Sequence, residues 1–191
     1  MHSINTHVFG RYTITVIDNL FSWAEMEGLY TNFCTLPYRI ANSNQVDIQA
    51  LQDRHLKADI DPTFLQSIQF FGENRDEVIS SFFKHANYGL YKSYVNLGVK
   101  GDAHFCHADT YYPEQGKTLL YYANRDWDVN QGGETVFYDE EKKEIVYVVT
   151  FKPGRVVIFD SDMPHSARPQ ALDGPNYRFT LALKYLKDYG A

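Results

Sequence analysis

The chain has 191 residues, of which 44% are hydrophobic and 16% aromatic, and a formal net charge of −6. This length is enough for a single domain over residues 1–191 with a substantial buried core. The apolar runs are too short to span a membrane, and without a basic cluster a nucleic-acid backbone is not expected as the main partner. Cys34 and Cys106 do not make a disulfide framework, so we expect free thiols. The N-terminus shows no signal-peptide pattern, which makes the cytoplasm the expected location.

Residues 1–90 are expected to form a strand followed by helices. Residues 12–18 alternate and are β-branched, which predicts a strand. Ser22, with Glu25 three residues later, is typical of a capping box and predicts a helix that runs to about Cys34. The other expected elements are strand and loop over 38–58, a short helix from Asp61-Pro62 to Phe70 or Phe71, and a helix from Asn74 that Asn87 and Gly89 end.

The pattern changes at Tyr91, where helical periodicity gives way to short extended runs. Glycine and proline turn residues separate these runs, which are 91–98, 104–109, 118–124, 134–138, 144–151, 155–160 and 178–185. Successive strands without intervening helices favour an antiparallel sandwich or barrel. We therefore expect a mainly β protein, of the α+β kind, with the N-terminal helices packed outside the sheet.

The segment 102–109 carries the strongest signal for chemistry. If it is a strand, His107 and Asp109 point to one face and Ala108 to the other. A third ligand must come from elsewhere, and His165 is the best candidate. Two imidazoles and one carboxylate, with the other positions open, form the facial triad that suits non-haem Fe(II) and oxygen chemistry. The alternative is structural: Asp109 caps a turn and His165 follows a proline in a loop.

The segments around this triplet resemble the Fe(II)- and 2-oxoglutarate-dependent oxygenases, most closely the prolyl 4-hydroxylase-like branch. The resemblance covers about residues 90–186 and includes an arginine, Arg178, after the distal histidine. The flanking segments that match are 120–127 with Gly132-Gly133-Glu134-Thr135, then 153–159, and finally 176–184. The resemblance implies a double-stranded β-helix, or jelly roll, over 91–186, with the metal inside the barrel mouth and residues 1–90 as a buttress of helices and strands.

The resemblance also implies cofactors and the residues that hold them. His107, Asp109 and His165 would bind Fe(II), and 2-oxoglutarate and O2 would be co-substrates, with ascorbate as an optional addition. Arg178 would pair bidentately with the distal carboxylate of 2-oxoglutarate, a task that suits a planar guanidinium. Tyr122 lies where the prolyl hydroxylases place a tyrosine that touches this carboxylate. The alternatives are a surface arginine and a core tyrosine.

Three more residues are expected near the co-substrate. Alternation along a strand puts Thr180 on the same face as Arg178, where its hydroxyl would add a hydrogen bond. Tyr94 and Asn96, on a preceding strand, would line the pocket. Gly132-Gly133 is expected to form a tight turn without a chemical role.

The candidates for substrate contact are Lys184, Tyr111, Tyr112 and Arg168. Lys184 stands where oxygen-sensing prolyl hydroxylases have a tryptophan, so it is expected to face a polar or anionic substrate group or to be a solvated strand end. Tyr111 and Tyr112 would cover the site or serve packing. Arg168 would reach an anion at the mouth or be solvated.

Two neighbours of the triplet are not expected to be ligands. His104 and Cys106 fall on the strand face opposite His107, which favours packing. Asp109 itself bears on the reaction, because a related halogenase would carry a small residue there. Hydroxylation or another oxidation is therefore indicated.

The resemblance implies hydroxylation of an unactivated C–H bond in the manner of the prolyl 4-hydroxylases, with release of succinate and CO2, and the expected partner is a peptide or small-molecule substrate. The first alternative keeps this chemistry but uses a free amino acid, small metabolite or natural-product intermediate. A nucleic-acid demethylase is disfavoured, because the segment after Arg178 lacks the asparagine and second arginine of that branch. The last alternative is a cupin-like metal-binding module without turnover.

Overall fold

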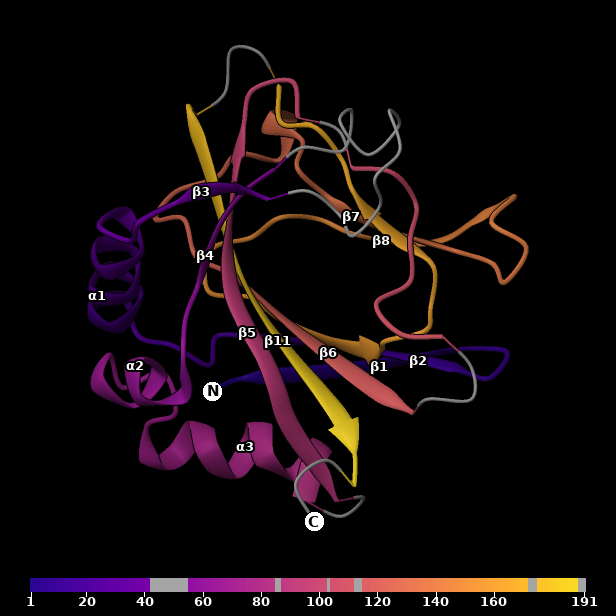
Figure 1. Cartoon of the computed structure of the whole chain (residues 1–191), viewed down its shortest axis with the longest axis horizontal. Coiled ribbons are helices and arrows are strands. Elements are labelled where there is room, and N and C mark those ends of the chain that lie inside the picture. Colours follow the sequence, from indigo (N-terminus) through magenta and orange to yellow (C-terminus); the bar gives the residue numbers. More distant parts are fainter. Residues whose placement is uncertain (42–54, 85–86, 103, 112–114, 172–174, 189–191) are drawn as a thin grey trace.

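The computed structural model describes residues 1–41, 55–84, 87–102, 104–111, 115–171 and 175–188 (Figure 1). It contains two antiparallel sheets and three helices. The strands are β1 (Ser3–Phe9), β2 (Tyr12–Asp18), β3 (Arg39–Ala41), β4 (His55–Asp59), β5 (Tyr88–Val99), β6 (Gly116–Tyr122), β7 (Thr135–Tyr138), β8 (Ile145–Val149), β9 (Val156–Asp160), β10 (His165–Ala167) and β11 (Tyr177–Lys187). The helices are α1 (Trp23–Cys34), α2 (Pro62–Ser67) and α3 (Glu73–Lys84), with a short 3-10 helix at Val129–Gln131.

The larger sheet has the strand order β1-β2-β9-β6-β11-β5-β4-β3, and the smaller one has the order β10-β7-β8. Strands β1 to β4 come from residues 1–90, so this part of the chain extends the large sheet as well as supplying the helices. The three helices lie together along one side of the large sheet (Figure 1). The expected mainly β architecture is thus confirmed.

Alternation along the central strands divides the large sheet into two faces with different tasks. On β11, Phe179, Leu181 and Leu183 belong to the apolar core shared with the helices. Their neighbours Arg178, Thr180, Ala182 and Lys184 point the other way and line a pocket. A second apolar core, with Leu120 and Phe137 among its members, joins this inner face to the small sheet. The helical layer therefore supports the sheet from behind and leaves the inner face for the site.

The predicted helix starts are confirmed at two positions. Ser22 is the N-cap of α1, and the Glu25 carboxylate accepts from the Ser22 backbone N–H at 2.7 Å in a capping box. Asp61 is the N-cap of α2 and accepts from the Phe64 N–H at 2.8 Å, with Pro62 in the first turn.

Several predicted boundaries are wrong. Helix α2 ends at Ser67 rather than near Phe70, and α3 begins at Glu73, one residue before the expected Asn74. Gly89 does not end a helix, because it already lies within β5. Of the expected strand and loop over 38–58, residues 42–54 lie outside the described residues. Strand β3 precedes them and strand β4 follows them.

The predicted strand over 104–109 is also wrong. Within it only His107 is in β-bridge geometry, in an isolated bridge to His165. The backbone N–H groups of Asp109 and Thr110 both donate to the Ser161 carbonyl, at 2.7 and 3.2 Å. The segment is thus fixed at two points, the bridge to the first residue of β10 and the contacts to Ser161, rather than by a continuous ladder.

Among the residues that the structure describes, none of the helices is both long and apolar enough to cross a membrane.

Candidate metal and co-substrate site

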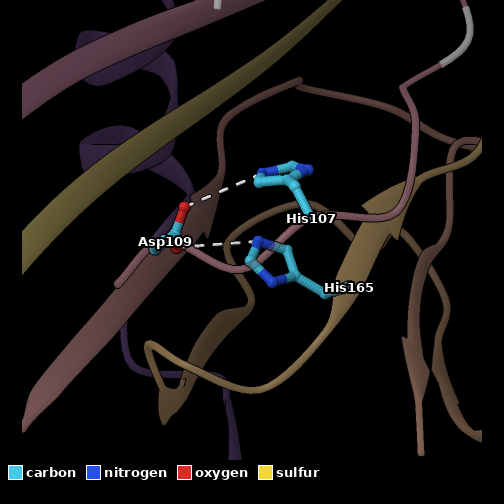
Figure 2. Close-up of side chains that lie close together, drawn as sticks. All are labelled: His107, Asp109 and His165. Carbon is cyan, nitrogen blue, oxygen red and sulfur yellow. Dashed lines mark ion pairs between the residues drawn. The ribbon is translucent and has the colours of Figure 1, made fainter. Parts of the chain in front are cut away.

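His107, Asp109 and His165 come together at the inner face of the large sheet (Figure 2). Their potential ligand atoms all lie within 4.8 Å of one another. His107 Nε2 is 3.7 Å from Asp109 Oδ1, and His165 Nε2 is 3.6 Å from Asp109 Oδ2. The three residues predicted as ligands are therefore brought together, and both imidazoles turn the same ring nitrogen toward the carboxylate.

Backbone carbonyls orient the two imidazoles. His107 Nδ1 lies 2.9 Å from the Phe105 carbonyl oxygen, and His165 Nδ1 lies 2.9 Å from that of Met163. Because a carbonyl only accepts, each Nδ1 must carry the proton, which leaves the Nε2 lone pair free for a metal. Burial lowers the pKa of His165 to about 3, so its ring is neutral at neutral pH.

The Asp109 carboxylate is buried and charged. Burial by itself would raise its pKa, but nearby positive charge, above all the Lys184 ammonium, outweighs this and holds the pKa below the usual range. Asp109 Oδ2 accepts a hydrogen bond from Thr118 Oγ1 at 2.7 Å and forms an ion pair with Lys184. Lys184 is only 4% exposed, so it is not a solvated strand end.

The same pocket contains a buried guanidinium. Arg178 is 6% exposed, and its Nε has no hydrogen-bond partner among the described residues. Thr180 Oγ1 and Asn96 Oδ1 are likewise buried without partners in the described structure, and all three residues line the pocket together with the triad. Native proteins satisfy most buried polar atoms, so this group indicates a place for a polar ligand.

The position of Arg178 depends on aromatic rings and on a glycine. Its guanidinium carbon lies 4.9 Å from the centre of the Phe151 ring and 5.8 Å from that of Tyr122. A Cβ atom built on Gly133, whose φ is +77°, would lie 3.1 Å from Arg178 Nε and 3.0 Å from Trp127. Gly133 thus allows the backbone to approach Arg178 closely. The sequence alone predicts only a turn at this position and does not reveal this role. A Gly-Gly pair in the sequence was the only available signal.

The other predicted cofactor contacts take different positions. Tyr94 lines the pocket, and the Lys184 ammonium is 5.9 Å from the centre of its ring. Tyr122 is fully buried, and its hydroxyl is 2.6 Å from Thr135 Oγ1. It lies beside Arg178 rather than among the lining residues, where Thr135 is found instead.

Of the predicted substrate contacts, Lys184 lines the pocket, whereas Tyr111 and Arg168 do not. Tyr111 is 74% exposed, Arg168 is also exposed, and neither lines the pocket. Tyr112 lies outside the described residues. By contrast, His104 does line the pocket, although it was expected to pack on the opposite face from His107. The face prediction failed because residues 104–109 are not a strand, so side-chain alternation does not apply there.

These residues fit an Fe(II) ion and a dicarboxylate co-substrate. The donor set is two imidazoles, whose Nε2 atoms face the carboxylate, and one carboxylate, the set typical of non-haem Fe(II) oxygenases. The Arg178 guanidinium, whose Nε has no hydrogen-bond partner among the described residues, offers the fork geometry that binds a carboxylate bidentately. Both features belong to one pocket, so a molecule that bridges them would be in contact with the metal and the arginine together.

Comparison with known proteins gives the same assignment. Residues 91–185 match the family model of the 2OG-Fe(II) oxygenase superfamily. A search of curated proteins found no match to the sequence. A prolyl hydroxylase of Trichoplax adhaerens, solved with a peptide of the hypoxia inducible factor oxygen degradation domain, is similar over 92% of this chain and 84% of its own, with 22% identity and a TM-score of 0.66.

Two further structures are similar in fold. A prolyl-4-hydroxylase of Pseudomonas putida is similar over 93% of this chain and 93% of its own, with 14% identity and a TM-score of 0.64. The non-haem α-ketoglutarate-dependent epimerase SnoN of nogalamycin biosynthesis is similar over 91% of this chain and 78% of its own, with 12% identity and a TM-score of 0.63.

The predicted resemblance and the double-stranded β-helix fold are therefore confirmed. The family uses Fe(II) and 2-oxoglutarate, and the chain has a His-Asp-His site of the corresponding kind. Through residues 91–185, which include His107, Asp109, His165 and Arg178, the chain belongs to the 2OG-Fe(II) oxygenase superfamily.

Proposed function

We propose that the chain is a 2-oxoglutarate-dependent hydroxylase that oxidises an unactivated C–H bond, in the manner of the prolyl 4-hydroxylases. The observation that carries this proposal is the buried Arg178, whose Nε has no hydrogen-bond partner among the described residues, in the pocket that also contains His107, Asp109 and His165. A protein that only stored a metal would gain nothing from a buried guanidinium whose Nε lacks a hydrogen-bond partner among the described residues, because burying such a group has a free-energy cost.

Each residue has a defined task in this proposal. His107 and His165 would hold Fe(II) through Nε2, and Asp109 through its carboxylate. Arg178 would hold the distal carboxylate of 2-oxoglutarate, with a hydrogen bond from Thr180. Bound iron and 2-oxoglutarate would supply the oxidising chemistry, with CO2 and succinate as products. The protein would contribute orientation and a pocket from which water is excluded.

The substrate is proposed at the level of its class. A prolyl peptide is supported by the fold shared with two prolyl hydroxylases, one of which was solved with a peptide. A small molecule is the second candidate, because Lys184 replaces the tryptophan of the oxygen-sensing prolyl hydroxylases and because SnoN acts in nogalamycin biosynthesis. The cytoplasmic location stays a prediction.

The test is succinate formation from 2-oxoglutarate by the iron-reconstituted protein in air, without any added substrate. Asp109→Ala and Arg178→Met should each abolish this uncoupled turnover. Arg125→Met is the matched control, because Arg125 pairs with Glu27 on the surface and should leave turnover unchanged. Turnover that survives both site variants, or that is absent from the wild type with no effect of 2-oxoglutarate on iron binding, would contradict the proposal and favour a binding module.

If turnover is confirmed, prolyl peptides and small metabolites can be compared by how strongly each stimulates succinate release. Coupled turnover with a proline-containing peptide, together with a mass gain of one oxygen atom, would assign the first substrate class. Stimulation only by small molecules would assign the second.

A further inference from the structure

The closest partner of the Asp109 carboxylate is a lysine side chain. The side chains of Asp109 and Lys184 are 9% and 5% exposed, and their ion pair is completed by Thr118, whose Oγ1 lies 3.3 Å from Lys184 Nζ. Asp109 Oδ2 therefore has two protein partners, while Oδ1 faces His107 Nε2. An ammonium thus lies against the carboxylate to which a dication would bind.

Strand register explains how the lysine comes to this position. Lys184 on β11 pairs directly with Thr118 on β6, so the two side chains emerge side by side on the inner face. Alternation puts Lys184 on the same face as Arg178, in the interior of the barrel rather than in the helical core. The pair is therefore part of the built pocket and not a surface contact.

We propose that Lys184 is an internal counter-ion of Asp109, which stabilises the protein without metal and weakens metal binding. The inference rests on the proposed function insofar as it takes Asp109 to be a metal ligand. Lys184 is a positioning residue in this account, since it acts through Asp109 and touches no reacting atom.

The physical argument starts with the cost of a buried charge. A carboxylate taken out of water and left without a partner is strongly destabilising, whereas a paired one is tolerated. Without metal, Lys184 supplies the pairing charge. With a dication bound, the carboxylate is already compensated, and the ammonium instead repels the metal at close range in a medium of low dielectric.

The two states therefore respond differently to loss of the lysine charge. Removing it should destabilise the metal-free protein more than the metal-bound protein. By thermodynamic linkage, the variant must then bind the metal more tightly. A lysine with a merely structural role would change both states equally and leave metal affinity as it was.

The test measures Co(II) affinity in the absence of 2-oxoglutarate, by titration against a chelating dye, for the full-length protein. Lys184→Met should bind Co(II) at least tenfold more tightly than the wild type, with a lower Tm without metal and a larger rise in Tm on adding Co(II). Lys184→Gln keeps a hydrogen-bond donor without the charge, and it should also bind more tightly; it decides the matter if Lys184→Met does not fold.

Thr118→Val is the matched control, because it removes a hydrogen bond to the same Asp109 oxygen without changing any charge. Its Co(II) affinity should stay within threefold of the wild type. Unchanged or weaker Co(II) binding by both lysine variants would overturn the counter-ion role. If instead the wild type binds no Co(II), or binds it equally well after His165→Ala, the metal site itself fails and with it both the proposed function and this inference.

Discussion

His107 and His165, far apart in the chain, are joined by two backbone hydrogen bonds. The His107 N–H donates to the His165 carbonyl with an N···O distance of 3.0 Å, and the His165 N–H donates to the His107 carbonyl with an N···O distance of 2.8 Å. Their rings consequently lie with centroids 4.6 Å apart. The backbone bridge, rather than the side chains, sets the separation of the two imidazoles. A metal site at this position is therefore preorganised by main-chain pairing, and a side chain can be removed without removing the bridge.

The first prediction follows from this bridge. His107→Ala should lower Co(II) affinity by more than about 100-fold, beyond the range typical for residues that only support a ligand. Its Tm without metal should change little, because the His107 side chain is 47% exposed. Dye-competition titration and thermal unfolding measure the two effects. His104→Ala is the control in the same pocket, since His104 is outside the ligand cluster; an equal loss of affinity there would contradict the assignment.

The second prediction concerns the co-substrate. Arg178→Met should weaken 2-oxoglutarate binding by about 2–5 kcal/mol, or at least about 30-fold, because a buried charged partner is removed. Co(II) affinity should remain as in the wild type. Isothermal titration of the Co(II)-loaded protein with 2-oxoglutarate measures the change. Arg178→Lys keeps the charge but loses the planar fork, so its affinity for 2-oxoglutarate should lie between those of the wild type and Arg178→Met. Equal 2-oxoglutarate affinity in all three proteins would exclude Arg178 from the carboxylate site.

The third prediction concerns Gly133. Gly133→Ala should cost about 1–3 kcal/mol of stability, since it forces a side chain into a strained backbone region and against Arg178 and Trp127. It should also weaken 2-oxoglutarate binding by displacing the guanidinium. Gly28→Ala, within α1 and with no atom within 4 Å of the added Cβ, is the control and should stabilise by about 0.5–1 kcal/mol. Urea unfolding measures the change in stability of both variants. Equal changes would show that the close contact between Gly133 and Arg178 does not matter for stability.

The fourth prediction concerns pH. Burial lowers the pKa of His165 to about 3, whereas a histidine in the unfolded chain has a value of about 6.5. Between these values the unfolded state binds a proton that the folded state does not. His165 should therefore make the free energy of unfolding of the metal-free protein rise by about 1.36 kcal/mol per pH unit between about pH 4 and 6. This stabilisation is complete above the unfolded pKa and is lost as the pH falls.

Urea unfolding in the presence of a chelator at several pH values measures this slope. The His165→Gln variant should have a slope smaller by the same amount. The lowered pKa of Asp109 adds to the slope only below about pH 5, and the part of the slope measured above that value is free of it. Identical slopes in the wild type and the variant would contradict the buried, neutral state of His165.

Predictions from the sequence succeeded where the signal was local. The capping box of Ser22 and Glu25 needs only neighbouring residues, and it begins α1 as expected. The alternation of β11 likewise placed Arg178 and Thr180 on one face. Strand β1 and the short β10 were missed: β1 is held by pairing with β2, and β10 by pairing with β7. For β10 the partner is distant in sequence and leaves little trace in three residues, whereas β1 was missed although its partner β2 is the next strand in the chain.

The sequence by itself determined the mainly β class and the set of candidate ligands, because residue type and strand periodicity carry that information, and its family resemblance made Arg178 the candidate for the co-substrate. Only the tertiary structure decided that residues 104–109 are held by a bridge at His107 and contacts to Ser161. It also decided that Gly133 lies against Arg178 and that the Lys184 ammonium rests on Asp109. These contacts depend on the register between strands and on the close approach of distant segments, and such long-range geometry arises only when the whole chain packs.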